Sequence, residues 1–186
     1  AEQGFTLIEL LLSLSLGSLL FVVLLQLIGT DLRLGSSMAS RLRESAQQRR
    51  TLELIRGELA MGSGWEVDPT PSHQWSCGMA GRQPVLAIGL DGSDSRASAQ
   101  TIVYSVGAAP SAIWRGQVLM RCGPAYGLDG VIRPGGQAQN RVLIDGLPNE
   151  VLGVQARQDP QSKVLHLALE QAVNGGSGRL RSAAVF

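Results

Sequence analysis

The front of the chain is an apolar run of 24 residues from Phe5 to Ile28, interrupted by one charge, Glu9, and one amide, Gln26. As a helix this run would be about 36 Å long, enough to cross the roughly 30 Å hydrocarbon core of a bilayer. It exceeds the apolar part of a secretory signal, about 7 to 15 residues, and no small-residue cleavage site follows it. We therefore expect a membrane helix that stays with the mature protein.

Beyond this run the pattern becomes that of an amphipathic helix. Apolar residues recur at the spacings of three and four that mark one helical stripe: Leu34, Met38, Leu42 and Ala46, then Leu52, Ile55 and Leu59. No proline comes before Pro69, so one helix can run from Phe5 to about Met61 and end at Gly62 to Gly64. We expect the stripe to pack on the chain's own C-terminal domain, with local unwinding around Gly29 to Gly35.

After Trp65 the pattern is that of short strands separated by turn residues. The predicted strands are Pro84 to Leu90, Gln100 to Val106, Ile113 to Arg121, Arg141 to Asp145, Glu150 to Arg157, Lys163 to Glu170 and Arg179 to Val185. Alternation places Ile102, Tyr104 and Val106 on one face, and likewise Leu165, Leu167 and Leu169. We expect an α+β fold in which a long N-terminal helix packs on one face of an antiparallel sheet, with a hairpin turn at Asp159 to Ser162.

Composition narrows the classes of partner. A net charge of +1 with 17% charged residues gives no strongly basic face for nucleic acid. The two cysteines, Cys77 and Cys122, are too few for a zinc site, so a disulfide is the better interpretation. It would close a loop of roughly 45 residues, for which the chain-entropy model gives about 4 kcal/mol. Such a bond indicates an oxidising compartment, hence a periplasm or cell surface.

No catalytic constellation accompanies these elements. His73 lies in a proline-rich loop, and His166 falls on the strand face opposite Leu165 and Leu167. The acidic run from Asp91 to Asp94 lacks the spacing and closing Glu of a calcium loop, and the glycine-rich stretches at 135–136 and 175–178 lack phosphate-loop spacing. We expect no catalytic residue, no metal and no cofactor, and a protein that is not an enzyme. The three tryptophans could form a partner-binding surface, although core packing is the commoner use: Trp65, Trp75 and Trp114.

Glu9 is the unusual residue of the apolar run. A carboxylate this close to the start of a lipid-facing helix costs a few kcal/mol unless it has a partner. We expect no partner within its own helix. It either reaches water at the membrane edge or pairs with a group on another molecule.

The residues around Glu9 suggest which group on another molecule would be its partner. Gly4-Phe5-Thr6-Leu7-Ile8-Glu9, directly before a membrane-length helix, resembles the processing motif of type IV prepilins and type II secretion pseudopilins. The resemblance implies that Ala1 to Gly4 is a leader remnant, that a prepilin peptidase cuts between Gly4 and Phe5, and that the new Phe5 amine is methylated. It also implies that Glu9 of one subunit pairs with this amine on a neighbour. The expected domains are then the remnant at 1–4, the spine helix at 5–62 and a β-rich domain at 63–186.

The resemblance extends more weakly into the rest of the chain. The segment Leu52 to Trp65 and the strand succession around 102–106, 113–115 and 142–147 are similar to minor pilins of the PilW type and pseudopilins of the J type. This implies a minor, tip-proximal pilin. One alternative is a J-type pseudopilin of type II secretion, and a second is a bitopic periplasmic binding protein that is never cut.

The same resemblance implies the partners and the location. The partners would be other pilin or pseudopilin subunits, the peptidase, membrane lipid and an inner-membrane assembly platform. The subunit would cross the bacterial inner membrane once, with its C-terminal domain in the periplasm, before it enters a filament. The arginines that follow the apolar run would by themselves place this domain in the cytoplasm. The cysteine pair and the resemblance favour the periplasm.

Overall fold

The structure is a computed structural model that describes residues 6–73, 75–90, 101–133, 136–149, 153–173 and 178–186, without the side chains of 30–34 and 36–37. The chain divides into two compact units, Ala1–Ser40 and Arg41–Phe186, which we treat separately. The fold is α+β, with one long helix and antiparallel sheets, as predicted.

Helix α1 runs from Leu7 to Met61 without a break, so the unwinding expected around Gly29 to Gly35 does not occur. The helix ends at Met61, as the glycines that follow it predict. Gly62 is required at this point, because a Cβ atom there would lie 2.5 Å from a side-chain carbon of Ile88. The chain therefore leaves the helix in direct contact with strand β2.

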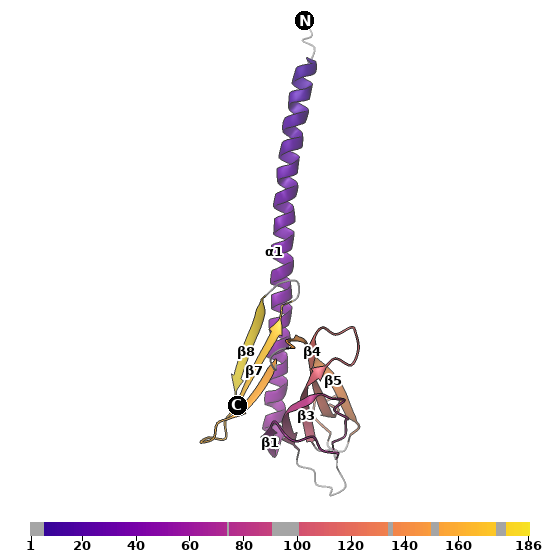
Figure 1. The fold of residues 1–186 in the computed structure, drawn as a ribbon, viewed down its shortest axis with the longest axis vertical. Coiled ribbons are helices and arrows are strands. Elements are labelled where there is room, and N and C mark those ends of the chain that lie inside the picture. Colours follow the sequence, from indigo (N-terminus) through magenta and orange to yellow (C-terminus); the bar gives the residue numbers. More distant parts are fainter. Residues whose placement is uncertain (1–5, 74, 91–100, 134–135, 150–152, 174–177) are drawn as a thin grey trace. The chain divides into compact units, whose positions relative to one another are not determined.

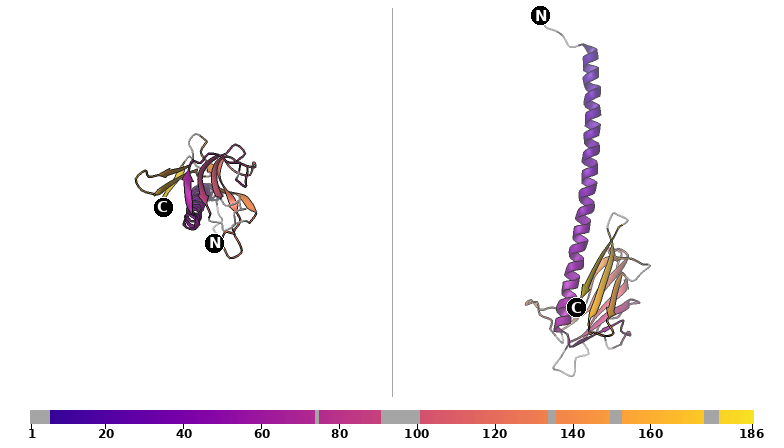
Figure 2. Two further views of the ribbon diagram at one scale, coloured as in Figure 1. Left: turned by 90° about the horizontal axis from the view of Figure 1, so that it is seen from below. Right: turned by 90° about the vertical axis from the view of Figure 1, so that its left-hand side faces the viewer.

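Eight strands form two antiparallel sheets in the second unit (Figure 1). The larger sheet has the order β1-β2-β3-β4-β5, a meander of sequential neighbours: Gly64–Val67, Gln83–Gly89, Thr101–Ala108, Gln117–Pro124 and Ala138–Leu147. The smaller sheet has the order β6-β7-β8: Val154–Gln158, Leu165–Ala172 and Arg179–Val185. The C-terminal part of α1 runs beside the strands of the second unit (Figure 2). Hydrogen bonds from Gln47 to Leu143 in β5 and from Gln48 to Gln171 in β7 join it to both sheets.

One strand was missed, and the bounds of several others differ from the prediction by a few residues. Strand β1 was not predicted, because four residues that begin with a glycine give almost no periodic signal. Strand β4 begins at Gln117 rather than Ile113, since Gly116 has a φ of 55° and ends a turn. The turn expected at Asp159 to Ser162 is present, with the Asp159 carboxylate accepting bonds from Gln161 N and Ser162 Oγ. Residues 150–152, predicted to begin a strand, lie outside the described residues.

The expectation that one face of the sheet packs against the helix stripe is confirmed, but the opposite face of β3 is covered as well. All five residues from Ile102 to Val106 in β3 are at most 2% exposed, so both faces of this strand are covered. Ile102 and Tyr104 belong to the main core with Ile55 of α1. Val103 and Ser105 point to the opposite face, where Val103 lies beside Cys122 in the neighbouring strand.

The apolar stripe of α1 was predicted correctly only near its C-terminal end. Ile55 is 2% exposed, and Leu52 and Leu59 pack partly buried against the core. Met38 and Leu42, however, are 62% and 70% exposed. The helix face that is buried in the second unit carries four polar residues: Glu44, Gln48, Thr51 and Glu58. The hydrogen bonds of Gln48 and Glu58, described below, make the burial of these two side chains possible.

Candidate functional site

The N-terminus of α1 is closed by a capping box formed by Thr6 and Glu9. Thr6 N and Thr6 Oγ1 both donate to Glu9 Oε2, at 3.1 and 2.9 Å. Glu9 N in turn donates to Thr6 Oγ1 at 3.4 Å. The first N–H groups of a helix have no partner within it, so this reciprocal arrangement stabilises the first turn.

Our expectation that Glu9 has no partner in its own helix was therefore wrong. Thr6 lies three residues earlier and faces the same turn, and its backbone N–H and hydroxyl are uncharged donors to the carboxylate. Both bonds end on Oε2, and no described residue donates to Oε1. The cap thus leaves one carboxylate oxygen for a further donor. Gly4 and Phe5, the predicted cleavage and methylation residues, lie outside the described residues.

The helix that follows is long and apolar enough to cross a membrane from Leu7 to Gly29. Every large apolar side chain between Leu7 and Ile28 is at least 44% exposed, so this segment has no apolar environment within the chain. Leucines and valines exposed over this length need lipid or other subunits around them.

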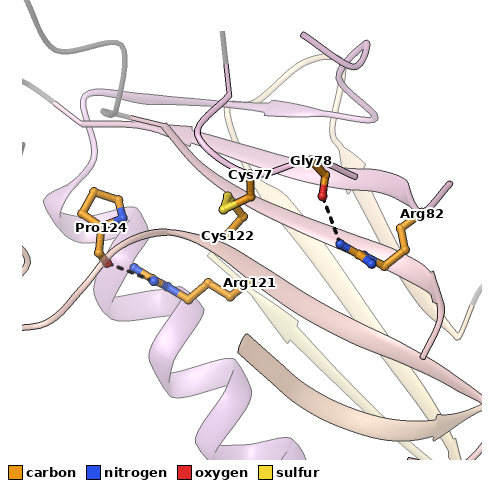
Figure 3. Close-up of a disulfide and its surroundings, with 6 residues drawn as sticks. All are labelled: Cys77, Gly78, Arg82, Arg121, Cys122 and Pro124. Carbon is orange, nitrogen blue, oxygen red and sulfur yellow. Dashed lines mark hydrogen bonds between the residues drawn. A yellow bond between two sulfur atoms is a disulfide. The ribbon is translucent and has the colours of Figure 1, made fainter. Parts of the chain in front are cut away.

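Cys77 and Cys122 form a disulfide, with their Cα atoms 6.0 Å apart (Figure 3). Cys122 lies in β4 and is 1% exposed, whereas Cys77 lies in the segment between β1 and β2. A bond from Arg82 Nη2 to Gly78 O, at 3.2 Å, closes the same segment. Burial lowers the pKa of the Arg82 guanidinium. The disulfide therefore ties this segment to the sheet face that carries Cys122.

A buried ion pair joins the end of α1 to the larger sheet. Glu58 is fully buried and accepts a bond from Arg121 Nε in β4 at 2.6 Å. The hydroxyls of Tyr104 and Tyr126 also donate to the Glu58 carboxylate, and the Arg121 guanidinium lies over the Tyr126 ring at 5.1 Å from its centroid. Arg121 Nη1 donates to Pro124 O at 3.1 Å (Figure 3). A charge pair of this kind is tolerated in a core because further hydrogen bonds reach both groups, although Arg121 Nη2 is buried without a partner among the described residues.

The same contacts act on the two tyrosines. Burial raises the pKa of Tyr104 well above its ordinary value, and the negative charge of Glu58 and the bond to it act in the same direction. Burial, followed by the bond to Glu58 and the charge of Glu58, likewise raises the pKa of Tyr126. Both hydroxyls therefore stay protonated as donors across the physiological range.

About three turns earlier on the helix, Gln48 joins α1 to the smaller sheet. Gln48 Nε2 donates to Gln171 Oε1 at 3.2 Å and to Leu180 O at 3.3 Å. Ser182 Oγ donates to Gln48 Oε1 at 2.5 Å. Gln171 completes the set with a bond to Asp145 O in β5, at 2.9 Å. Each amide is fully buried and partnered on both sides, so the helix is fixed to the sheets by hydrogen bonds as well as by apolar contact.

Sequence reasoning missed both polar clusters. A signal was present: Glu44, Gln48, Thr51, Ile55, Glu58 and Gly62 follow one another at alternating spacings of four and three, which places them on one helix face. We followed the parallel series of apolar residues instead, because a polar face usually indicates solvent.

Within the described ranges, no group of three or more His, Cys, Asp or Glu side chains could hold a metal ion. His73 and His166 are both exposed. Trp65 packs partly buried against the core, and Trp75 and Trp114 are half-buried. Trp65 and Trp75 line one pocket together, and none of the three tryptophans is fully exposed.

Comparison with known proteins agrees with the N-terminal site. A family model described as the prokaryotic N-terminal methylation motif matches residues 1–25. No curated protein and no solved structure is significantly similar to the chain. The chain thus carries a type IV pilin-like prepilin motif, which supports a type IV pilin or pseudopilin in general. Such a motif implies processing by a prepilin peptidase, membrane anchoring and assembly with other pilins.

Proposed function

We propose that this chain is a minor, tip-proximal subunit of a type IV pilus. A prepilin peptidase cuts it between Gly4 and Phe5, the Phe5 amine is methylated, and the subunit waits in the inner membrane with residues 63–186 in the periplasm. It then enters the filament through its N-terminal helix. The observation that carries this proposal is the methylation motif at residues 1–25 on a helix whose apolar side chains are exposed along its length.

Glu9 has two separable roles in this proposal. Its Oε2 atom accepts the bonds from Thr6 that cap the helix, and its charge pairs with the Phe5 ammonium of a neighbouring subunit. The pair would neutralise both charges where no water is available, which favours one register between subunits. The capping box prepares this contact, because it holds the carboxylate at the end of the helix where a neighbour's amine would arrive.

Mass spectrometry of the N-terminal peptide tests the proposal directly. We expect the protein from cells with an active prepilin peptidase to begin at a methylated Phe5, and the protein from peptidase-deficient cells to keep Gly4. An intact Gly4–Phe5 bond in the active cells would remove the pilin interpretation and favour a bitopic membrane protein.

Two variants at Glu9 separate its charge from its cap. Glu9→Gln keeps a side chain that can accept the Thr6 bonds but has no charge, whereas Glu9→Ala removes both functions. We expect both variants to be cleaved and both to be strongly depleted from purified filaments. Normal incorporation of Glu9→Gln would show that the cap alone matters, and the charge-pair account would then be wrong.

The alternative within the same class is a J-type pseudopilin of type II secretion, which the resemblance at Leu52 to Trp65 also supports. The chemistry of the N-terminus is the same for both machines. Deletion of the gene separates them, because loss of surface pili with normal protein secretion is expected for a minor pilin. Loss of secretion with normal pili would favour the pseudopilin.

A further inference from the structure

A short hairpin between β4 and β5 presents an apolar tip to solvent. Tyr126 and Ile132 form its base as an antiparallel bridge, and Gly127 N donates to Val131 O at 2.8 Å. Leu128, at the tip, is 109% exposed, and Val131 is 53% exposed. Turn positions usually hold Gly, Pro, Asn, Asp or Ser, so an exposed leucine serves no purpose in this turn itself.

The base of the hairpin is fixed to the core. Ile132 is 5% exposed and belongs to the main hydrophobic cluster, and the Tyr126 hydroxyl bonds Glu58 of α1. The tip is therefore held in place before any partner arrives. Such preorganisation lowers the entropic cost of binding.

A groove on another side of α1 has an apolar lining with two positive charges, and so complements the hairpin tip. It has a volume of about 360 Å³, and its lining consists of four apolar side chains, Ala60 and two cations: Leu59, Trp65, Val185, Phe186, Arg56 and Lys163. No acidic side chain lines it, and neither cation forms an ion pair with any residue in the described part of the chain. The groove therefore fits an apolar group that carries a negative charge.

The hairpin tip is such a group. Asp129 follows Leu128, and its side chain is 57% exposed. Its own ion pair, with Arg133, spans 3.9 Å on the surface, and an exposed pair of this kind contributes little. Leu128 and Asp129 together supply the apolar anchor and the carboxylate that the groove lacks.

The tip and the groove lie at the same level of α1 but on different sides. The hairpin base is tied to Glu58, whereas Arg56 and Ala60, two residues away in either direction, border the groove. Two residues correspond to about 200° around a helix, so these positions point away from Glu58. We propose that the hairpin tip of one copy of this chain inserts into the groove of a second copy, side by side.

A contact between two different surfaces of the same chain is heterologous, so each copy still offers a free tip and a free groove. A minor subunit needs only one such contact, between two copies in the membrane before assembly, and no extended array of this chain is required. The contact needs only two copies anchored in one membrane. It therefore goes beyond the proposed function and does not depend on which filament the subunit enters.

Thiol cross-linking of full-length chains in the membrane tests the contact. One tagged chain carries Val131→Cys beside the intact Leu128, and a second, differently tagged chain carries Ala60→Cys at the groove. A short bis-maleimide is added to cells that express both. The matched control replaces Val131→Cys by Ile113→Cys, which is 80% exposed on a different loop. We expect the mixed pair to cross-link about tenfold faster than the control pair.

Adding Leu128→Ser to the Val131→Cys chain should lower this rate about tenfold, because truncation of a central anchor typically costs that much. The exposed side chain makes no core contact, so folding is not at risk.

A charge exchange in trans gives a second measurement. Asp129→Arg on one chain should slow cross-linking, and Lys163→Asp on the other should restore it.

Three results would overturn the proposal. A mixed pair that reacts no faster than the control would show that the tip does not reach the groove. Two Val131→Cys chains that cross-link as fast as the mixed pair would indicate a symmetric contact between tips. Capture of a different envelope protein, with no mixed pair, would assign the groove to another partner. In each case, cleavage at Gly4 reports separately on the proposed function.

Discussion

Between Leu7 and Gly29, helix α1 exposes its leucines and keeps its one carboxylate, Glu9, in a cap at the first turn. Between Arg41 and Met61 the same helix exposes Leu42 and buries Glu44, Gln48, Thr51 and Glu58. The apolar side chains of the first segment therefore have no apolar environment within the chain. The polar side chains that the second segment buries have polar partners in the same chain.

The difference follows from where each segment finds its contacts. Leucine side chains need only an apolar environment without direction, and lipid and the helices of other subunits provide one. A buried carboxylate or amide needs donors and acceptors at fixed positions, and only the folded sheets of its own chain provide these. The first segment can therefore exchange lipid for the helices of other subunits, whereas the second stays bound to the sheets of its own chain.

Removing the buried charge at the end of α1 should have the largest effect on stability. Glu58→Ala leaves Arg121 buried without its partner, and we expect a loss of about 3–5 kcal/mol in the free energy of unfolding. Urea unfolding of the full-length chain in detergent, followed by tryptophan fluorescence, measures it. The matched control is Glu53→Ala, an exposed carboxylate on the same helix. Equal losses for the two variants would contradict the account of Glu58 as a buried charge that depends on its partners in the sheet.

Loss of the disulfide should rank second. The double variant Cys77→Ala and Cys122→Ala removes a cross-link across a sequence separation of 45 residues. We expect the free energy of unfolding to fall by about 2–4 kcal/mol. Non-reducing electrophoresis should show a mobility shift on reduction for the native chain and none for the variant. An unchanged urea midpoint would mean that the segment between β1 and β2 stays attached to the sheet without the disulfide.

Alkaline pH should weaken the second unit through its tyrosines. The pKa of Tyr104 is raised in the fold, so the unfolded chain loses this proton first, near pH 10. Stability is complete below that pH and falls above it, by up to about 1.4 kcal/mol per pH unit for each tyrosine held protonated. Urea midpoints from pH 8 to 11 measure the slope. Tyr104→Phe should reduce it, and an unchanged slope would exclude this tyrosine as its source.

The smallest effect is expected at the exposed end of the predicted apolar stripe. Leu42→Ala should change the free energy of unfolding by less than about 0.5 kcal/mol, since the side chain is 70% exposed. Ile55→Ala, on the same predicted stripe but 2% exposed, is the matched control and should cost about 2–5 kcal/mol. A large loss for Leu42→Ala would show that this leucine packs in the chain after all.

Much of the fold follows from local patterns. The length of α1, its end at Met61 and most of the strands could be predicted from spacing, glycines and alternation. Strand β1 could not, because its four residues are held by pairing with β2 and not by their own composition. The buried polar face of α1 was also missed. Glu58 or Gln48 on a helix normally indicates water, and nothing local shows that tyrosine, arginine and glutamine partners lie across from them.

The sequence by itself determined the N-terminal motif, the membrane-length helix and the cysteines available for a disulfide, because each depends on neighbouring residues or on residue type alone. Only the tertiary structure decided which face of α1 is buried, that both faces of β3 are covered, and that Glu58 meets Arg121. Contacts of this kind join residues 46 to 134 positions apart, and the sheets that bring them together form as a whole.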